Sequence, residues 1–192
     1  PLNEVAGAVA KGLGVPVPEG DPAAALDRLA RDGATRSRET AAETRKAAME
    51  WIRSAASAVG EESREKVRQR HLATLQRWSA TMDLAHPGAR VELGLTAGTM
   101  PGIVLAVERK GKAQNPVSLG SWEITIAVPD SARTLSFPMS RLFPPKVEKA
   151  DAETGARVAP GAQSFGELEP LFEQARKEGR ENRYMVTGNI LA

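Results

Sequence analysis

The chain has 192 residues, of which 26% are charged, with a formal net charge of +2 at pH 7 and no cysteine. The lack of cysteine excludes disulfides, thiolate zinc sites and cysteine nucleophiles. No apolar run approaches the ~20 residues needed to cross a bilayer and nothing resembles a signal peptide, so we expect a cytoplasmic chain without a membrane partner. A pI near 9.2 permits contact with nucleic acid without requiring it.

Residues 1–88 are predicted to be helical. Residues 2–13 carry apolar side chains at spacings of three and four, which indicates one amphipathic helix. Asp21 followed by proline is an N-cap pattern, and it begins a short second helix that we expect to end at Gly33.

Residues 37–84 contain no proline, and Gly60 is their single glycine. Two amphipathic helices that meet at Gly60 predict an antiparallel hairpin. One continuous helix is the alternative, because a glycine inside a helix costs only about 1 kcal/mol. We expect Trp51 and Trp78 to seal the hairpin and His71 to be a core residue. The two apolar stripes consist of Ala41, Ala48, Ile52, Ala55 and Val59, and of Val67, His71, Leu75, Trp78 and Met82.

The polar faces of this hairpin mix basic and acidic residues. Such mixing is typical of a solvated face with charge pairs four residues apart. A stripe that follows phosphates is the other interpretation, and it fits the second helix best. After the first turn of that helix, Glu65 is outnumbered by Arg64, Lys66, Arg68, Arg70 and Arg77.

Residues 89–145 are predicted to form a small, strongly bent antiparallel sheet that closes as a barrel of SH3 type, so the fold class is α+β. A barrel leaves no exposed strand edges in so small a sheet. Residues 138–143 read as a short helical turn before a closing strand. The predicted strands are Arg90–Leu95, Gly102–Arg109, Ser121–Val128 and Arg133–Phe137.

The predicted loop between the second and third strands, residues 110–120, is long and polar. It can place a basic rim on the barrel. For any single residue a solvated hairpin loop is the better explanation, and only the cluster of cations favours binding. Small barrels often bind nucleic acid or peptides through such loops, but the fold alone does not establish this. The rim would consist of Arg109, Lys110, Lys112, Arg133 and Arg141.

The tail, residues 146–192, begins with a charged stretch, residues 146–163, that we expect to be an exposed linker. Ser164 and Glu167 form a capping-box pattern at the start of a predicted helix over residues 164–179. Residues 183–191 read as a strand, which either completes the barrel or belongs to a following element. Because the chain begins at a proline and ends in an apolar run, we expect it to be a piece of a longer polypeptide.

A search for catalytic chemistry finds little. The sequence has no phosphate-binding loop, no nucleophile elbow and no His, Asp and Glu set at metal-ligand spacing. We therefore expect no catalytic residue, metal or cofactor in this segment.

The closing Arg-Tyr-Met-Val-Thr-Gly-Asn-Ile-Leu-Ala, residues 183–192, resembles a segment after the helicase core of strawberry-notch-like proteins of bacteria, plasmids and phages. Residues 102–105 and 132–142 are similar to the same region. The resemblance implies an accessory region of a superfamily-two helicase, often joined to methyltransferase parts. ATP and Mg would then be bound in the parent protein, and no catalytic residue carries over to this segment.

Two functions follow from the sequence. The leading hypothesis is a non-catalytic module of a larger DNA-processing protein that binds DNA and contacts other domains of the same polypeptide. The alternative is a scaffold that docks other domains or partners without nucleic-acid contact. The predicted nucleic-acid-binding residues are Arg64, Arg68, Arg70, Arg109, Lys110, Lys112, Arg133 and Arg141.

Overall fold

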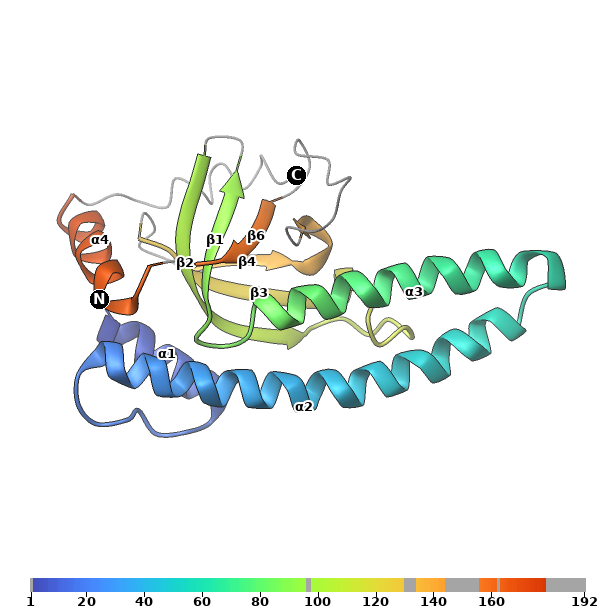
Figure 1. The fold of residues 1–192 in the computed structure, drawn as a ribbon, viewed down its shortest axis with the longest axis horizontal. Helices are drawn as coiled ribbons and strands as arrows, with labels where there is room; N and C mark the ends of the chain where they lie inside the picture. The colour runs from blue at the N-terminus through green and yellow to red at the C-terminus, as the bar shows by residue number, and fades with distance from the viewer. Residues whose placement is uncertain (1, 96–97, 130–133, 144–155, 162, 179–192) are drawn as a thin grey trace.

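The computed structural model describes residues 2–95, 98–129, 134–143, 156–161 and 163–178. Within these ranges the fold is α+β, as expected, with helices on both faces of one sheet (Figure 1). None of the described helices is long and apolar enough to cross a membrane. The helices are α1 (Leu2–Leu13), α2 (Pro22–Ser57), α3 (Glu61–Leu84) and α4 (Phe165–Lys177). The strands are β1 (Arg90–Leu95), β2 (Gly98–Arg109), β3 (Trp122–Ala127), β4 (Leu135–Pro138), β5 (Leu142–Phe143) and β6 (Ala156–Pro160).

The sheet has the strand order β4-β3-β2-β1-β6-β5. All neighbours are antiparallel except β5 and β6, which are parallel. No pairing joins β4 to β5 among the described residues, so closure into a barrel of SH3 type is not confirmed. The helical turn predicted between them is present as a 3-10 turn, Met139–Arg141.

Strand β6 corrects the prediction that residues 146–163 are a linker. Residues 156–160 pair with β1, with Val91 opposite Pro160 and Gly94 opposite Arg157. A short stretch of alanine, arginine, valine and proline has no local strand pattern, and the open edge of β1 supplies the hydrogen-bonding partners that make it a strand. The rest of the predicted linker lies outside the described residues except Gly161 and Gln163.

Helix α2 corrects the prediction of two helices separated at Gly33. Asp21 does cap the helix, since its Oδ2 accepts from the backbone N–H of Ala24 at 3.2 Å. The helix then continues through Gly33 to Ser57, a total length of 36 residues. The helix tolerates this glycine because it costs only about 1 kcal/mol and lets α2 lie directly against the backbone of Pro87.

Helices α2 and α3 form the predicted antiparallel hairpin around Gly60. Trp78 is fully buried, and its ring meets the ring of Trp122 of β3 edge to face at 5.3 Å. His71 is not a core residue as predicted: it is only partly buried, with its ring 4.6 Å from that of Trp51. Its ring packs on Trp51, a partly buried residue at the margin of the first core.

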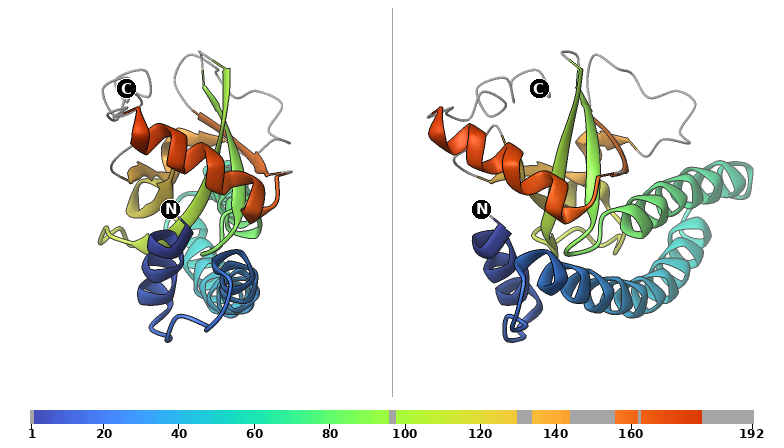
Figure 2. Two further views of the ribbon diagram at one scale, coloured as in Figure 1. Left: turned by 90° about the vertical axis from the view of Figure 1, so that its left-hand side faces the viewer. Right: turned by 60° about the vertical axis from the view of Figure 1, so that its left-hand side comes forward.

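Two apolar cores lie on the two faces of the sheet. The first packs the middle of α2 and the C-terminal half of α3 against the strands, including Trp122 and Ile124. The second packs α1, the start of α2 and α4 against Ile103 and Leu105 of β2. Figure 2 shows α1 and α4 on the same side of the sheet. A bulge between Val104 and Ala106 bends β2 between these cores.

The far end of the hairpin, residues 53–70, extends beyond the sheet (Figure 1), and we call it the arm. None of its residues belongs to either core. The arm therefore contributes little to the packing of the sheet and offers most of its surface to solvent.

Candidate nucleic-acid interface

The arm holds three of the predicted nucleic-acid-binding residues, and all three are exposed: Arg64, Arg68 and Arg70. Arg68 lies 3.6 Å from the carboxylate of Glu65, a pair that is well exposed and contributes little. With about 100° of rotation per residue, Arg64 and Arg70 lie about 120° apart around α3. These three cations therefore share one end of the hairpin but do not form a single row.

The end of β2 and the loop that follows it hold three more predicted residues, also exposed: Arg109, Lys110 and Lys112. The ammonium group of Lys110 donates to Glu108 at 2.8 Å, and this contact raises the pKa of Lys110. Arg109 donates to the carbonyl oxygen of Ala113 at 2.5 Å. Two of the three loop cations are thus already engaged within the chain.

This loop packs more closely than a solvated hairpin loop. Val117 is fully buried in the first core, and the indole N–H of Trp122 donates to the carbonyl oxygen of Pro116 at 2.8 Å. These buried contacts fix the backbone near the exposed side chains of Arg109 and Lys112.

The last two predicted residues have different outcomes. Arg141 lies half-buried in the 3-10 turn before β5. Arg133 lies outside the described residues.

Arg77, which was counted among the basic residues of α3, donates to the carbonyl oxygens of Ser140 and Leu142, each at 2.9 Å. It ties α3 to this turn, a role with no local signal because its partners are more than 60 positions away in the sequence.

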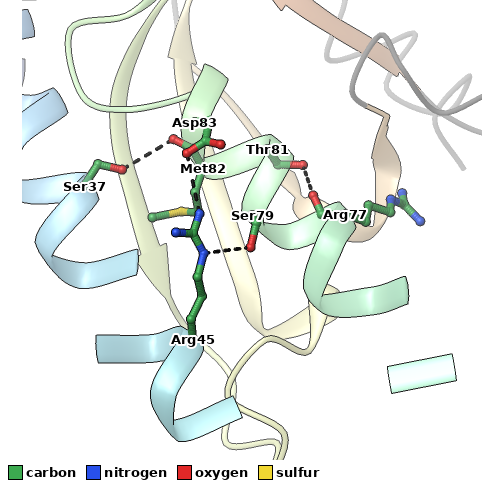
Figure 3. A network of polar contacts seen from close by, with 7 residues as sticks. All are labelled: Ser37, Arg45, Arg77, Ser79, Thr81, Met82 and Asp83. Atoms are coloured by element: carbon green, nitrogen blue, oxygen red, sulfur yellow. Dashed lines mark hydrogen bonds and ion pairs between the residues drawn. The ribbon is translucent and has the colours of Figure 1, made fainter. Parts of the chain in front are cut away.

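A polar network fixes the hairpin where it joins the sheet (Figure 3). Arg45 of α2 donates from Nε to Ser79 Oγ at 3.0 Å, and it lies 3.7 Å from Asp83. The hydroxyl of Ser37 donates to the carbonyl oxygen of Met82 at 3.4 Å. Sequence analysis did not identify this network, because each contact joins residues 34 or more positions apart.

An open groove of about 560 Å³ lies beside this network, between α2, the end of α3, β1 and α4. Its lining combines small residues with charged side chains of both signs. The charged and titratable residues of the lining are Asp27, Arg31, Asp83, His86 and Arg90. No group of three or more His, Cys, Asp or Glu among the described residues could hold a metal ion.

His86, which follows the end of α3, lies half-buried in this groove. Burial lowers the pKa of His86, the positive charge of Arg38 lowers it further, and a hydrogen bond to the carbonyl oxygen of Pro87 at 3.1 Å partly opposes both. The folded chain therefore favours the neutral imidazole.

This lowered pKa predicts a pH dependence of stability. His86 contributes fully to the free energy of unfolding above the unfolded pKa of about 6.5, and the contribution falls as the pH drops toward the lower folded value, because the unfolded chain binds the proton more tightly. We expect His86→Gln to reduce the stability lost between about pH 7.5 and about pH 5.5 in urea titrations. His71→Gln is the comparison. The pKa of His71 is also lowered, but His71 is less buried, so its substitution should reduce the pH dependence of stability less than His86→Gln does. An unchanged pH dependence in His86→Gln would contradict the prediction.

Comparison of the chain with protein-family models, curated proteins and solved structures finds no match.

Proposed function

We propose that this chain is a non-catalytic accessory module that binds nucleic acid within a larger helicase-like DNA-processing protein. The observation that carries the proposal is the arm, a helical hairpin end that extends beyond the sheet with Arg64, Arg68 and Arg70 exposed. Phosphate groups attract such cations, and a projecting element can reach a bulky polyanion without moving the core. The resemblance of residues 183–192 to the region after a strawberry-notch helicase core supports the same proposal, with ATP bound and hydrolysed elsewhere in the parent protein.

The proposal includes a sheet that closes as a barrel of SH3 type, with the loop after β2 forming a basic rim. A bulged, bent β2 and the 3-10 turn between β4 and β5 support it, because both are typical of small barrels. Lys112 is the rim cation best placed for phosphate contact, since Arg109 and Lys110 already have partners in the chain.

Binding governed by phosphates predicts a steep dependence on salt. Fluorescence anisotropy with labelled DNA should show an affinity that falls between about 50 and 200 mM salt, and three phosphate contacts of the arm alone would account for about 40-fold of this fall, because each contact adds about 0.9 to the slope. The triple substitution Arg64→Gln, Arg68→Gln and Arg70→Gln should flatten this slope. Substituting Glu61, Glu62 and Glu65 with glutamine is the matched control and should leave binding equal or tighter. Absence of binding at low salt, or binding that is insensitive to salt, would refute the proposed function.

A scaffold that docks other domains is the second candidate, and one observation favours it. Met49 of α2 is 40% exposed, more than any other large apolar side chain of the described helices, and it lies near the base of the arm. In that case Met49→Gln would weaken binding of a neighbouring domain of the parent protein, and neutralising the arm cations would leave that binding unchanged.

A further inference from the structure

The charged residues of α2 separate into two rows once the helix is known to be continuous. With about 100° per residue, Arg31, Arg38, Arg45 and Arg53 fall within a sector of about 80°. We call these four residues the arginine ridge. The acidic residues Asp32, Glu39, Glu43 and Glu50 fall within a different sector of about 40°, which does not overlap the ridge.

The remaining charges of α2 do not blur this separation. Arg36 points elsewhere and donates to the carbonyl oxygen of Leu13. Arg28 and Lys46 border the acidic sector, and Asp27 is the one acidic residue of α2 on the ridge side. No cation of α2 forms an ion pair with an acidic residue of the same helix. The ridge is therefore more than a solvated face with internal charge pairs.

The ridge is accessible along its length. Arg31, Arg38 and Arg53 are exposed, and the side chain of Arg45 retains 43% of its exposure while it contacts Asp83. Arg31 also lines the groove that holds His86 and Arg90. Arg90 lies across the groove from α2, but Asp27 and Asp83 balance the two arginines of the lining, so the cationic surface is the ridge itself.

We infer that the arginine ridge of α2 binds the sugar–phosphate backbone of a nucleic-acid duplex. This inference rests on the proposed function and names its substrate as double-stranded. The arginines recur every seven or eight residues, about 11 Å apart, and span about 33 Å of a helix that rises about 1.5 Å per residue. That span is close to one duplex turn of about 34–36 Å, so a rigid helix laid along one side of a duplex can meet phosphates of both strands where the two backbones cross its path.

A single strand is the poorer match for this surface. Proteins bind single strands by stacking bases on aromatic side chains. The rings of Trp78, Trp122 and Phe165 are buried in the two cores, and the partly exposed Trp51 packs on His71 and lies about 160° around α2 from the centre of the ridge. Arginine suits a duplex backbone because its planar guanidinium can donate two parallel hydrogen bonds to one phosphate.

The test uses the full 192-residue chain. Anisotropy is measured on a duplex of about two helical turns, on one of its strands alone and on the matching RNA duplex, each at several salt concentrations. We expect tighter binding to duplex than to single strand. The ridge variant R31Q/R38Q/R53Q should weaken duplex binding roughly tenfold or more and lower the salt slope by about three. Arg45 is left unchanged because it holds Ser79 and Asp83.

The matched control D32N/E39Q/E50Q removes three charges of opposite sign from the same helix, and it should bind duplex as tightly as the parent chain or more tightly. Thermal melting of each variant confirms that the fold is intact. A ridge variant with the parental affinity and slope would overturn the inference while the proposed function stands. Single-strand binding equal to duplex binding would overturn the duplex assignment. If the parent chain binds neither form at low salt, the proposed function fails too. The RNA duplex identifies which backbone is preferred.

Discussion

Gly33→Ala is expected to lower the free energy of unfolding by about 2 kcal/mol or more, although alanine favours helix by up to about 1 kcal/mol over glycine. A methyl group at this position would lie 2.1 Å from the carbonyl oxygen of Pro87 and 2.9 Å from its carbon. Neither the rigid turn after α3 nor a helix of this length can yield by that amount without losing contacts. The steric cost therefore exceeds the gain in helix propensity.

The same close approach is built from the other side by Gly88. Its φ of 81° lies in the left-handed region that favours glycine, and a methyl group there would lie 2.7 Å from Cα of Ala30. The two glycines let α2 and the turn pack backbone to backbone. This contact lies beside the groove that Arg31 and His86 line.

Denaturant unfolding followed by circular dichroism measures this effect, and Gly7→Ala is the matched control. Gly7 lies within α1 with open space around the position of a methyl group, so alanine there should raise the free energy of unfolding by about 0.5–1 kcal/mol. If Gly33→Ala stabilises the chain as Gly7→Ala does, α2 does not approach the backbone of Pro87 as closely as described, and the prediction fails.

Trp78→Ala is expected to cost about 3–5 kcal/mol of stability, the range for removing a large buried aromatic side chain. The side chain is fully buried at the centre of the first core, and its ring meets that of Trp122 at an interplanar angle of 62°. This contact joins α3 to β3. Its loss would leave a cavity exactly where the hairpin is anchored on the sheet, so we also expect weaker duplex binding near the melting temperature.

Two further substitutions test whether the loss of stability follows the buried volume that is removed. The indole nitrogen of Trp78 is buried and has no hydrogen-bond partner in the part of the chain that the structure describes, so Trp78→Phe removes volume but none of the described hydrogen bonds and should cost less than Trp78→Ala. Trp51→Ala, at a partly exposed position, should also cost less. Equal losses for Trp51→Ala and Trp78→Ala in urea titrations would contradict the central role of Trp78.

Local patterns predicted many elements of the fold. The helix over residues 2–13, the strand over residues 90–95 and the hairpin around Gly60 agree with the structure. The capping box of Ser164 and Glu167 forms as expected. These features depend on periodicity, caps and turn residues within a few positions, and such interactions act before any distant packing exists.

The candidate site was predicted less completely. The exposed cations of the arm could be identified from the charges of α3 alone. The ridge could not be identified from the sequence. The predicted break at Gly33 placed Arg31 and Arg38 on different helices, and residues of different helices need not lie on the same side of one helix axis. The roles of Arg45 and Arg77 depend on partners that are distant in the sequence.

The sequence by itself therefore determined the types and order of most elements, the positions of their caps and the exposed charges, because these depend on neighbours along the chain. Tertiary structure decided the rest. The turn at Pro87 accepts Gly33 inside a continuous α2, and the open edge of β1 turns residues 156–160 into a strand. In both cases a contact between distant backbones outweighs a local preference of about 1 kcal/mol, and the continuous helix in turn aligns the four arginines of the ridge.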